Sequence, residues 1–287
     1  MTDLLMAALR QLAAALQPDG IVLTVVGGYG LVLRTEAVRL TGERTLGGPV
    51  RWSRSTDDID CFLGHSVITD ATKTERIRLA LEQLGYRAAT EHFLYERTVQ
   101  TGTRAVVVRI DLMAAPVPAE DADRVVASDL RIHPVGYDRL HGRVTPGAAL
   151  VDESPMSLDI SSSGTALIVN LPHAYPYLIL KLFALRDGPA SRRPERAARH
   201  ALDMFTIWAT ITEAEYLSGL ALREKFAAHP IVSEAREIAS TLFAGLDAPA
   251  ILSLRVEARD SDILLETATI DAFQRDILMM LGAKAST

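Results

Sequence analysis

The sequence contains Arg54-Ser55-Thr56-Asp57-Asp58-Ile59-Asp60, and this stretch, preceded by Val25-Val26-Gly27-Gly28, predicts the fold. In a strand, residues two apart point to the same face, so Asp58 and Asp60 project side by side while apolar Ile59 faces the other way. Two adjacent carboxylates raise each other's pKa unless a cation lies between them. A hard divalent ion, Mg²⁺ above all, is the simplest explanation for the pair, because such an ion also binds nucleotide phosphates.

The composition is that of an ordinary globular protein of 287 residues, 48% hydrophobic and 23% charged. A net charge of -6 argues against wrapping long nucleic acids but allows a local basic patch. A single cysteine excludes an internal disulfide and fits a reducing compartment. We find neither a membrane-spanning apolar run nor a basic signal-peptide start, so we expect a cytoplasmic protein without a membrane partner.

The periodicity of apolar residues predicts a strand, a helix and a second strand around the two motifs. Glycines Gly27 and Gly28 stand where the first strand turns into the helix. The elements expected in this half are a helix at 4–16, a strand at 21–26, helices at 29–40 and 73–84, a strand at 58–63 and a hairpin of 92–99 with 104–113.

Near residue 170 the period changes from that of strands to that of helices. Residues 145–164 are rich in Pro, Gly, Ser and Asp and predict a surface connection. Helices are expected after it at 175–186, 197–211, 213–228, 232–246 and 262–281. The predicted fold class is α+β, with a mixed twisted β-sheet flanked by helices and then a C-terminal helical bundle. The predicted domains are 1–170 and 171–287, the second completing the active-site cleft.

Other residues in this pattern have a functional and a structural interpretation. Gly27 and Gly28 let the backbone approach a phosphate at a helix start, or they form a tight turn without a ligand. Asp111 shares a strand face with Arg109 and either adds a third carboxylate to the pair or forms an ion pair with Arg109. Lys181 lies in an apolar helix and needs an anion, which is either a ligand or Asp203 of the next helix.

Basic side chains surround the start of that next helix. They form a rim for a triphosphate or an RNA backbone, or simply a solvated helix face. These residues are Arg186, Arg192, Arg193, Arg196, Arg199 and His200.

Taken together, these residues resemble polymerase-β-like nucleotidyltransferases, and within them the AbiEii/MenT group of bacterial toxins. The resemblance spans roughly residues 20–210. It rests on Val26-Gly27-Gly28 with Leu31, on Arg54-x-Thr56-x-Asp58-Ile59-Asp60, and on Asp111, Lys181 and Asp203. Two features depart from the family: the link at 41–53 is long, and Arg199-His200 stands where many relatives carry Lys-Asp.

The resemblance implies a role for each motif residue. Mg²⁺, or Mn²⁺ in its place, would be bound by Asp58 and Asp60, with Asp111 as a third carboxylate. The nucleotide would contact Gly27, Gly28, Arg54 and Thr56. Lys181 would reach the triphosphate, and Asp203 would complete the site from the helical half. In some members the hydroxyl two residues before the first aspartate is modified, which makes modification of Thr56 a hypothesis.

The function that the resemblance implies is transfer of a nucleoside monophosphate from an NTP to the 3′ end of tRNA, by the toxin of a toxin–antitoxin pair. Its partners would be the NTP, the tRNA acceptor end and a cognate antitoxin. A small-molecule nucleotidyltransferase of the aminoglycoside type is an alternative, and a non-catalytic nucleotide-binding module is another. The arginines between 186 and 199 favour RNA.

Overall fold

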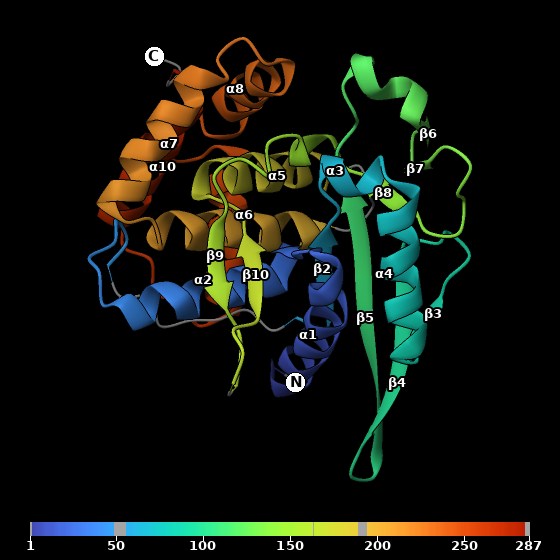
Figure 1. Ribbon diagram of the computed structural model, residues 1–287. Helices are drawn as coiled ribbons and strands as arrows, with labels where there is room; N and C mark the ends of the chain where they lie inside the picture. The colour runs from blue at the N-terminus through green and yellow to red at the C-terminus, as the bar shows by residue number, and fades with distance from the viewer. Residues whose placement is uncertain (1, 49–55, 163, 189–193, 285–287) are drawn as a thin grey trace. The chain divides into compact units, whose positions relative to one another are not determined.

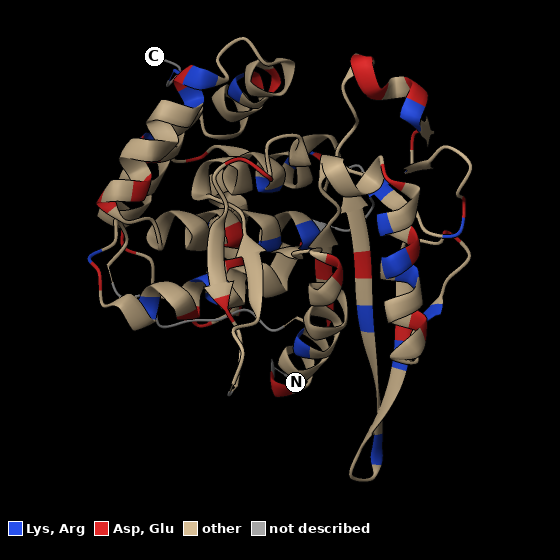
Figure 2. Ribbon diagram, in the orientation of Figure 1, with Lys and Arg blue, Asp and Glu red and all other residues tan. Residues whose placement is uncertain are grey.

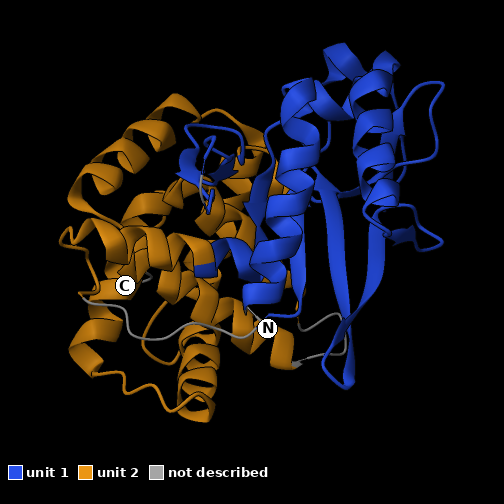
Figure 3. Ribbon diagram, turned by 60° about the horizontal axis from the view of Figure 1, so that its bottom comes forward, with its two compact units in different colours: residues 1–32, 54–145, 151–172 blue, residues 33–53, 146–150, 173–287 orange. Residues whose placement is uncertain are grey.

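The computed structural model describes residues 2–48, 56–162, 164–188 and 194–284. The chain divides into two compact units (Figure 3). Unit 1 consists of Met1–Val32, Arg54–Thr145 and Val151–Pro172, and unit 2 of Leu33–Ser53, Pro146–Leu150 and His173–Thr287. The predicted domains, 1–170 and 171–287, stay a prediction.

Unit 1 is built on a β-sheet. Its strands are β1 (Thr24–Val26), β2 (Asp58–Phe62), β3 (Arg87–Ala88), β4 (Leu94–Thr101), β5 (Arg104–Ala114), β6 (Val125–Ala127), β7 (Arg131–Pro134), β8 (Gly142–Val144), β9 (Met156–Asp159) and β10 (Ile168–Leu171). Their order is β6-β7-β8-β5-β2-β1-β10-β9, with β4 paired to β5 and β3 to β4 (Figure 1). The pairs β2–β5, β1–β10 and β5–β8 are parallel and the others antiparallel, which confirms the predicted mixed sheet.

Helices cover the apolar side of this sheet. The apolar residues of β2 and β5 that alternate with the carboxylates, Ile59, Cys61, Ile110 and Leu112, are completely buried. Helix α1 (Thr2–Leu16) contacts both strands and packs beside α4 (Ala71–Gln83). Short helical turns complete the unit: η1 (Gln17–Asp19), α3 (His65–Ile68) and η2 (Ala119–Arg124).

Unit 2 is helical. Its helices are α5 (Ala174–Asp187), α6 (Pro194–Ala209), α7 (Glu213–Lys225), α8 (Pro230–Leu242), α9 (Pro249–Asp260) and α10 (Thr267–Leu281), together with the C-terminal part of α2 (Gly27–Thr41). Helix α5 is apolar on nearly every side and buried on nearly every side, because α6, α7, α8 and the turn η3 (Pro146–Ala148) pack around it. This confirms the predicted C-terminal helices. In the parts of the chain that the structure describes, no helix has the length and apolar character needed to cross a membrane.

After residue 144, one expectation was wrong and one helix was missed. Residues 145–164 are more than a surface connection, because they include β9 and η3. Gly147 is buried there, and a Cβ on it would lie 2.9 Å from Cβ of Phe183, so the lack of a side chain allows close packing on α5. Helix α9 was not expected at all, since its charged residues obscure the apolar positions Ile251 and Leu254 that it buries.

A buried arginine holds α2 within unit 2. Arg34 is fully buried, donates through Nε to Oγ1 of Thr210 at 3.0 Å and forms a two-fold contact with the carboxylate of Glu215, one arm of which is 2.9 Å long. Glu215 also accepts from the backbone N–H of Ala174 at 2.9 Å. Burial by itself would raise the pKa of Glu215, but Arg34, with His173 and the Ala174 amide, brings it below its ordinary value.

We therefore predict that Arg34→Met destabilises the protein by about 3–5 kcal/mol, because the Glu215 carboxylate, whose side chain is only 17% exposed, loses its cation. The measurement is the free energy of unfolding in urea. The double variant Arg34→Met, Glu215→Leu should recover most of the loss, since no buried charge is then left alone. If the double variant were as unstable as the single one, the ion pair would not be the reason for the loss.

The same pair predicts a pH dependence. A carboxyl whose pKa is lower in the folded protein stabilises it above the unfolded pKa, about 4.3 for Glu, and this stabilisation is lost as the pH falls through the folded value. The unfolding free energy of the wild type should therefore fall below about pH 4. The decline should be shallower in the double variant, and identical curves would contradict this assignment.

Candidate active site

The strand register places three carboxylates on one face of the sheet in unit 1. Asp60 pairs across to Val26 of β1 and to Asp111 of β5, and Asp58 is in register with Arg109. Register partners on adjacent strands point to the same side, as do residues two apart on one strand. Asp58, Asp60 and Asp111 are therefore neighbours, and each is partly exposed.

The turn from β1 into α2 brings a glycine against one of these carboxylates. Gly27 has φ +66°, and a Cβ on it would lie 1.6 Å from Oδ2 of Asp60. The space that a side chain would occupy is thus filled by the carboxylate. Gly28 is buried in the first turn of α2, where backbone N–H groups lack helical partners and favour an anion. Binding of nucleotide phosphates by the two glycines stays a prediction.

Thr56 lies two residues before β2 and contacts the first aspartate of the pair. Its hydroxyl donates to Oδ1 of Asp58 at 2.8 Å, which fixes one oxygen of that carboxylate. The structure thus gives Thr56 a local role in addition to the predicted contact with the nucleotide, which stays a prediction. Arg54, the other residue predicted to line the phosphate pocket, lies outside the described residues.

Asp111 pairs with an arginine that the sequence did not indicate. Oδ2 of Asp111 accepts from Nη2 of Arg143 on β8 at 2.9 Å, whereas Arg109 pairs with Glu96 at 2.7 Å. The expected alternative of an Asp111–Arg109 pair is therefore wrong, although the two residues lie two apart on β5. Figure 2 shows acidic and basic positions along this strand. Arg143 escaped notice because its strand has three residues and no periodic pattern.

The environment of Asp111 is suited to a further cation. Burial raises the pKa of Asp111 above its ordinary value, the neighbouring charge of Asp58 adds to this, and Arg143 opposes it. Oδ1 of Asp111 is buried and has no hydrogen-bond partner among the residues that the structure describes. A buried acceptor without a partner is costly unless something binds it, so this oxygen is available to a metal ion or a donor from a ligand.

The carboxylates of this face can be compared with the ligands that a magnesium ion needs. Within the described residues, no three or more His, Cys, Asp or Glu side chains are already arranged as a metal site. Mg²⁺, however, is usually held by one or two carboxylates, with waters and substrate phosphates completing its shell. Asp58 and Asp60 fit such an ion if it arrives with a nucleotide, and the free Oδ1 of Asp111 fits a third contact. The three ligands stay a prediction.

The two other predicted catalytic residues belong to unit 2 and pair with each other. Nζ of Lys181 on α5 lies 2.7 Å from Oδ2 of Asp203 on α6, and only 4% and 1% of the two residues is exposed. Nδ1 of His200 lies 3.8 Å from the same oxygen. The structure thus shows the ion pair that was the structural alternative, and a contact of Lys181 with a triphosphate stays a prediction.

The predicted basic rim is only partly described. Arg186 is engaged by Asp187 and Glu234, whereas Arg196 and Arg199 on α6 are exposed. Arg192 and Arg193 lie outside the described residues.

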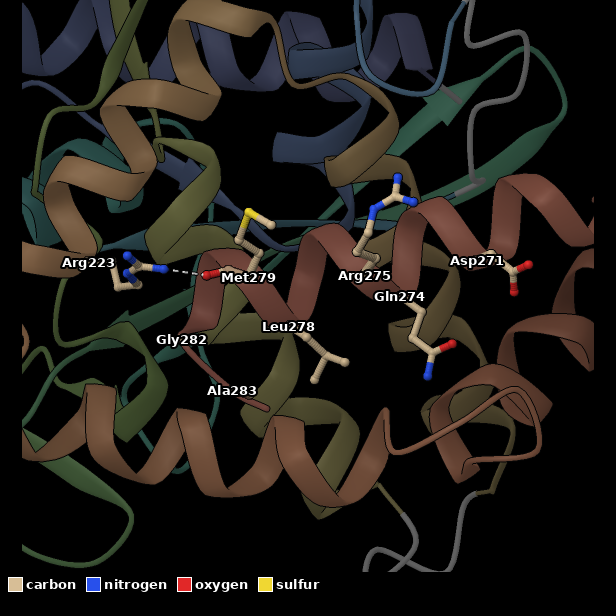
Figure 4. A pocket seen from close by; sticks show the side chains of 8 residues that line it. All are labelled: Arg223, Asp271, Gln274, Arg275, Leu278, Met279, Gly282 and Ala283. Atoms are coloured by element: carbon tan, nitrogen blue, oxygen red, sulfur yellow. Dashed lines mark hydrogen bonds between the residues drawn. The ribbon is translucent and has the colours of Figure 1, made fainter. Parts of the chain in front are cut away.

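Unit 2 also contains an open pocket of about 570 Å³ between α7 and α10 (Figure 4). Two of its polar side chains are already bonded within the protein: Arg223 donates to the carbonyl of Met279 at 2.6 Å, and Gln274 to that of Phe243 at 2.7 Å. A catalytic pocket needs convergent polar groups that are free to meet a ligand. The carboxylate face of unit 1 is therefore the better candidate.

Compared with known proteins, the chain matches no protein-family model and no curated protein. Among solved structures it is similar to the solution structure of the antibiotic-resistance factor ANT(2'')-Ia, with 13% sequence identity and a TM-score of 0.40. The similarity covers 79% of this chain and 96% of that one. At this degree of likeness, the function has to be inferred from the side chains of the chain itself.

The contact between Gly27 and Asp60 can be tested with a second glycine as control. Gly20 has φ +68°, close to that of Gly27, but a Cβ there would meet no atom of the described residues within 4 Å. Gly20→Ala should cost about 1–2 kcal/mol of unfolding free energy from backbone strain alone. Gly27→Ala should cost about 2–5 kcal/mol, because strain and displacement of Asp60 add together. Equal losses in urea unfolding would show that Asp60 does not pack against Gly27.

Proposed function

We propose that this chain is a metal-dependent nucleotidyltransferase, which moves a nucleoside monophosphate from an NTP to an acceptor hydroxyl. The observation that carries the proposal is the placement of Asp60, which lies against Gly27 at a strand-to-helix turn, beside Asp58 and in register with Asp111. Phosphoryl chemistry needs positioning and charge neutralisation more than covalent help from the protein. A phosphate-binding turn next to clustered carboxylates supplies the groups for both tasks.

In this reaction the acceptor oxygen attacks the α-phosphorus, a new oxygen–phosphorus bond forms, and the bond to the bridging oxygen of the departing pyrophosphate breaks. When bound by Asp58 and Asp60, Mg²⁺ supplies neutralisation of the phosphate charge. Thr56 keeps one oxygen of Asp58 oriented, and the N-terminal end of α2, the positive end of its dipole, attracts phosphate oxygens. Oδ1 of Asp111, which has no hydrogen-bond partner among the described residues, would add a third oxygen to the metal site, and the proton of the attacking hydroxyl passes to solvent water.

For the acceptor we propose the 3′ end of tRNA, with the protein acting as a growth-inhibiting toxin that a cognate antitoxin controls. The exposed Arg196 and Arg199 support an anionic acceptor. A single-stranded RNA end needs only a small basic surface, so the net charge of -6 is compatible with it. A cationic small-molecule acceptor is the alternative that the experiment below distinguishes.

The first test is incubation of the purified protein with each labelled NTP, Mg²⁺ and total bacterial RNA. Label should enter tRNA-sized RNA, and Asp58→Ala should lower the rate by about 10³-fold, because loss of several kcal/mol of charge stabilisation has that effect. Asp57→Asn is the matched control: its side chain is exposed and precedes the carboxylate pair, so its rate should stay within about twofold.

The possible outcomes show whether the proposed acceptor is wrong or the proposed reaction is wrong. Label in a cationic small molecule instead of RNA would keep the transferase and replace the acceptor. NTP binding that requires Mg²⁺, without transfer to any acceptor, would support the non-catalytic alternative. Equal activity of wild type and Asp58→Ala would overturn the proposal.

Lys181 can be tested without confusing catalysis with folding. Lys181→Met should destabilise the protein by about 3–5 kcal/mol, because Asp203 is left buried without its cation. Lys181→Met combined with Asp203→Leu should restore most of the unfolding free energy in urea. If the lysine reaches the triphosphate, the double variant is folded but inactive. A folded double variant with wild-type activity would make the pair purely structural.

A further inference from the structure

The two carboxylate oxygens of Asp111 have different surroundings. Oδ2 accepts from Arg143 at 2.9 Å, whereas Oδ1 is buried and no described part of the chain donates a hydrogen bond to it. Carboxylates rotate freely unless one oxygen is held, and an arginine nitrogen is a strong, directional donor to such an oxygen. The contact with Arg143 thus selects which oxygen of Asp111 is left for a ligand.

The arginine is itself held in place by the sheet. Arg143 is in register with Met113 of β5 on one side and with Arg131 of β7 on the other, so its backbone is fixed by both neighbours. Gly142 brings this strand close to β5, since a Cβ on it would lie 2.7 Å from Cβ of Ala114. A residue fixed in this way can orient a neighbouring carboxylate with little loss of its own freedom.

The strand register also explains why Asp111 pairs with Arg143 and not with Arg109, which is nearer in sequence. Arg143 shares the face of Met113, and Asp111 lies two residues before Met113 on that face. Arg109 lies on the same face, but it is in register with Glu96 of β4 and pairs with it. The two arginines therefore make similar ion pairs with different carboxylates of one surface.

We propose that Arg143 is a positioning residue for the proposed nucleotidyl transfer: it holds Asp111 through Oδ2, which leaves Oδ1 for the metal ion that Asp58 and Asp60 would hold. The inference rests on the proposed function for its reaction, but the pairing it invokes is independent of which acceptor is used. Removal of Arg143 leaves Asp111 free to turn, so the chemical step slows while nucleotide binding by other residues is retained.

The experiment compares Arg143→Met, Arg143→Lys and the control Arg109→Met. Groups that orient a metal ligand typically contribute about 10–100-fold, so Arg143→Met should lower kcat by that factor while KM for the NTP changes by about twofold or less. Arg143→Lys keeps a donor and should recover part of kcat. Arg109→Met removes only an exposed ion pair, with both side chains more than 40% exposed, and should stay within about twofold of wild type.

A second measurement does not depend on turnover. Mn²⁺ titrated into the protein with a non-hydrolysable NTP analogue, and followed by its paramagnetic resonance signal, should bind about tenfold more weakly to Arg143→Met than to wild type or Arg109→Met. Urea unfolding shows which variants are folded; if Arg143→Met is not, Arg143→Lys alone should give a smaller loss of kcat and of Mn²⁺ affinity.

Two results would overturn the proposal: unchanged kcat and Mn²⁺ affinity in the Arg143 variants, or equal losses in the Arg143→Met and Arg109→Met variants. Failure of the proposed function is a different observation, because the wild type would then transfer no label at all. The Mn²⁺ titration still decides in that case whether Arg143 holds Asp111 for a metal.

Discussion

Repulsion between neighbouring carboxylates is the constraint on which the candidate site depends. Asp58, Asp60 and Asp111 lie on one face of two parallel strands, and three negative charges at that spacing are unfavourable unless cations or donors oppose them. Thr56 donates to one of them and Arg143 to another. What these contacts leave is an oxygen of Asp111 without a partner in the described parts of the chain, and a surface suited to a divalent ion and phosphates.

The architecture of unit 1 places these carboxylates on one face of the sheet and the apolar residues on the other. Next to the carboxylates, the opposite faces of β2 and β5 are apolar and buried, and both strands contact α1, so the alternation along each strand separates a packed side from a charged side. Gly27 is needed at the turn because its missing side chain is the room that Asp60 occupies. The positive φ that glycine allows at this turn thus lets the Asp60 carboxylate lie against the backbone, next to the other carboxylates.

In unit 2, buried charges are neutralised by ion pairs within the protein. Arg34 with Glu215, and Lys181 with Asp203, are each placed in direct contact inside the helical packing. Such pairs offset the desolvation of their members and are strongly destabilising when one member is removed. The pair with Asp203 holds Lys181 in one position. A fixed position is compatible with a structural role and also with binding of a phosphate.

The sequence by itself determined the local elements around the motifs. Alternating apolar and acidic residues in Asp58-Ile59-Asp60 specify a strand with one charged face, the glycine pair specifies the turn before α2, and the apolar run around Lys181 specifies a buried helix. Periodicity and turn chemistry act within a few residues, so they can be recognised without the fold. The same locality explains why α9, whose charges obscure its apolar face, and the strands β3, β6 and β8 were not expected.

Only the tertiary structure decided which side chains meet. Whether Asp111 pairs with Arg109 or with another cation depends on the strand register, and β8, distant in sequence, brings Arg143 to it. Likewise, Gly147 packs on α5 within a stretch whose composition predicts a loop. Pairings of this kind depend on sheet order and close packing between segments far apart along the chain, and no local pattern of residues contains that information.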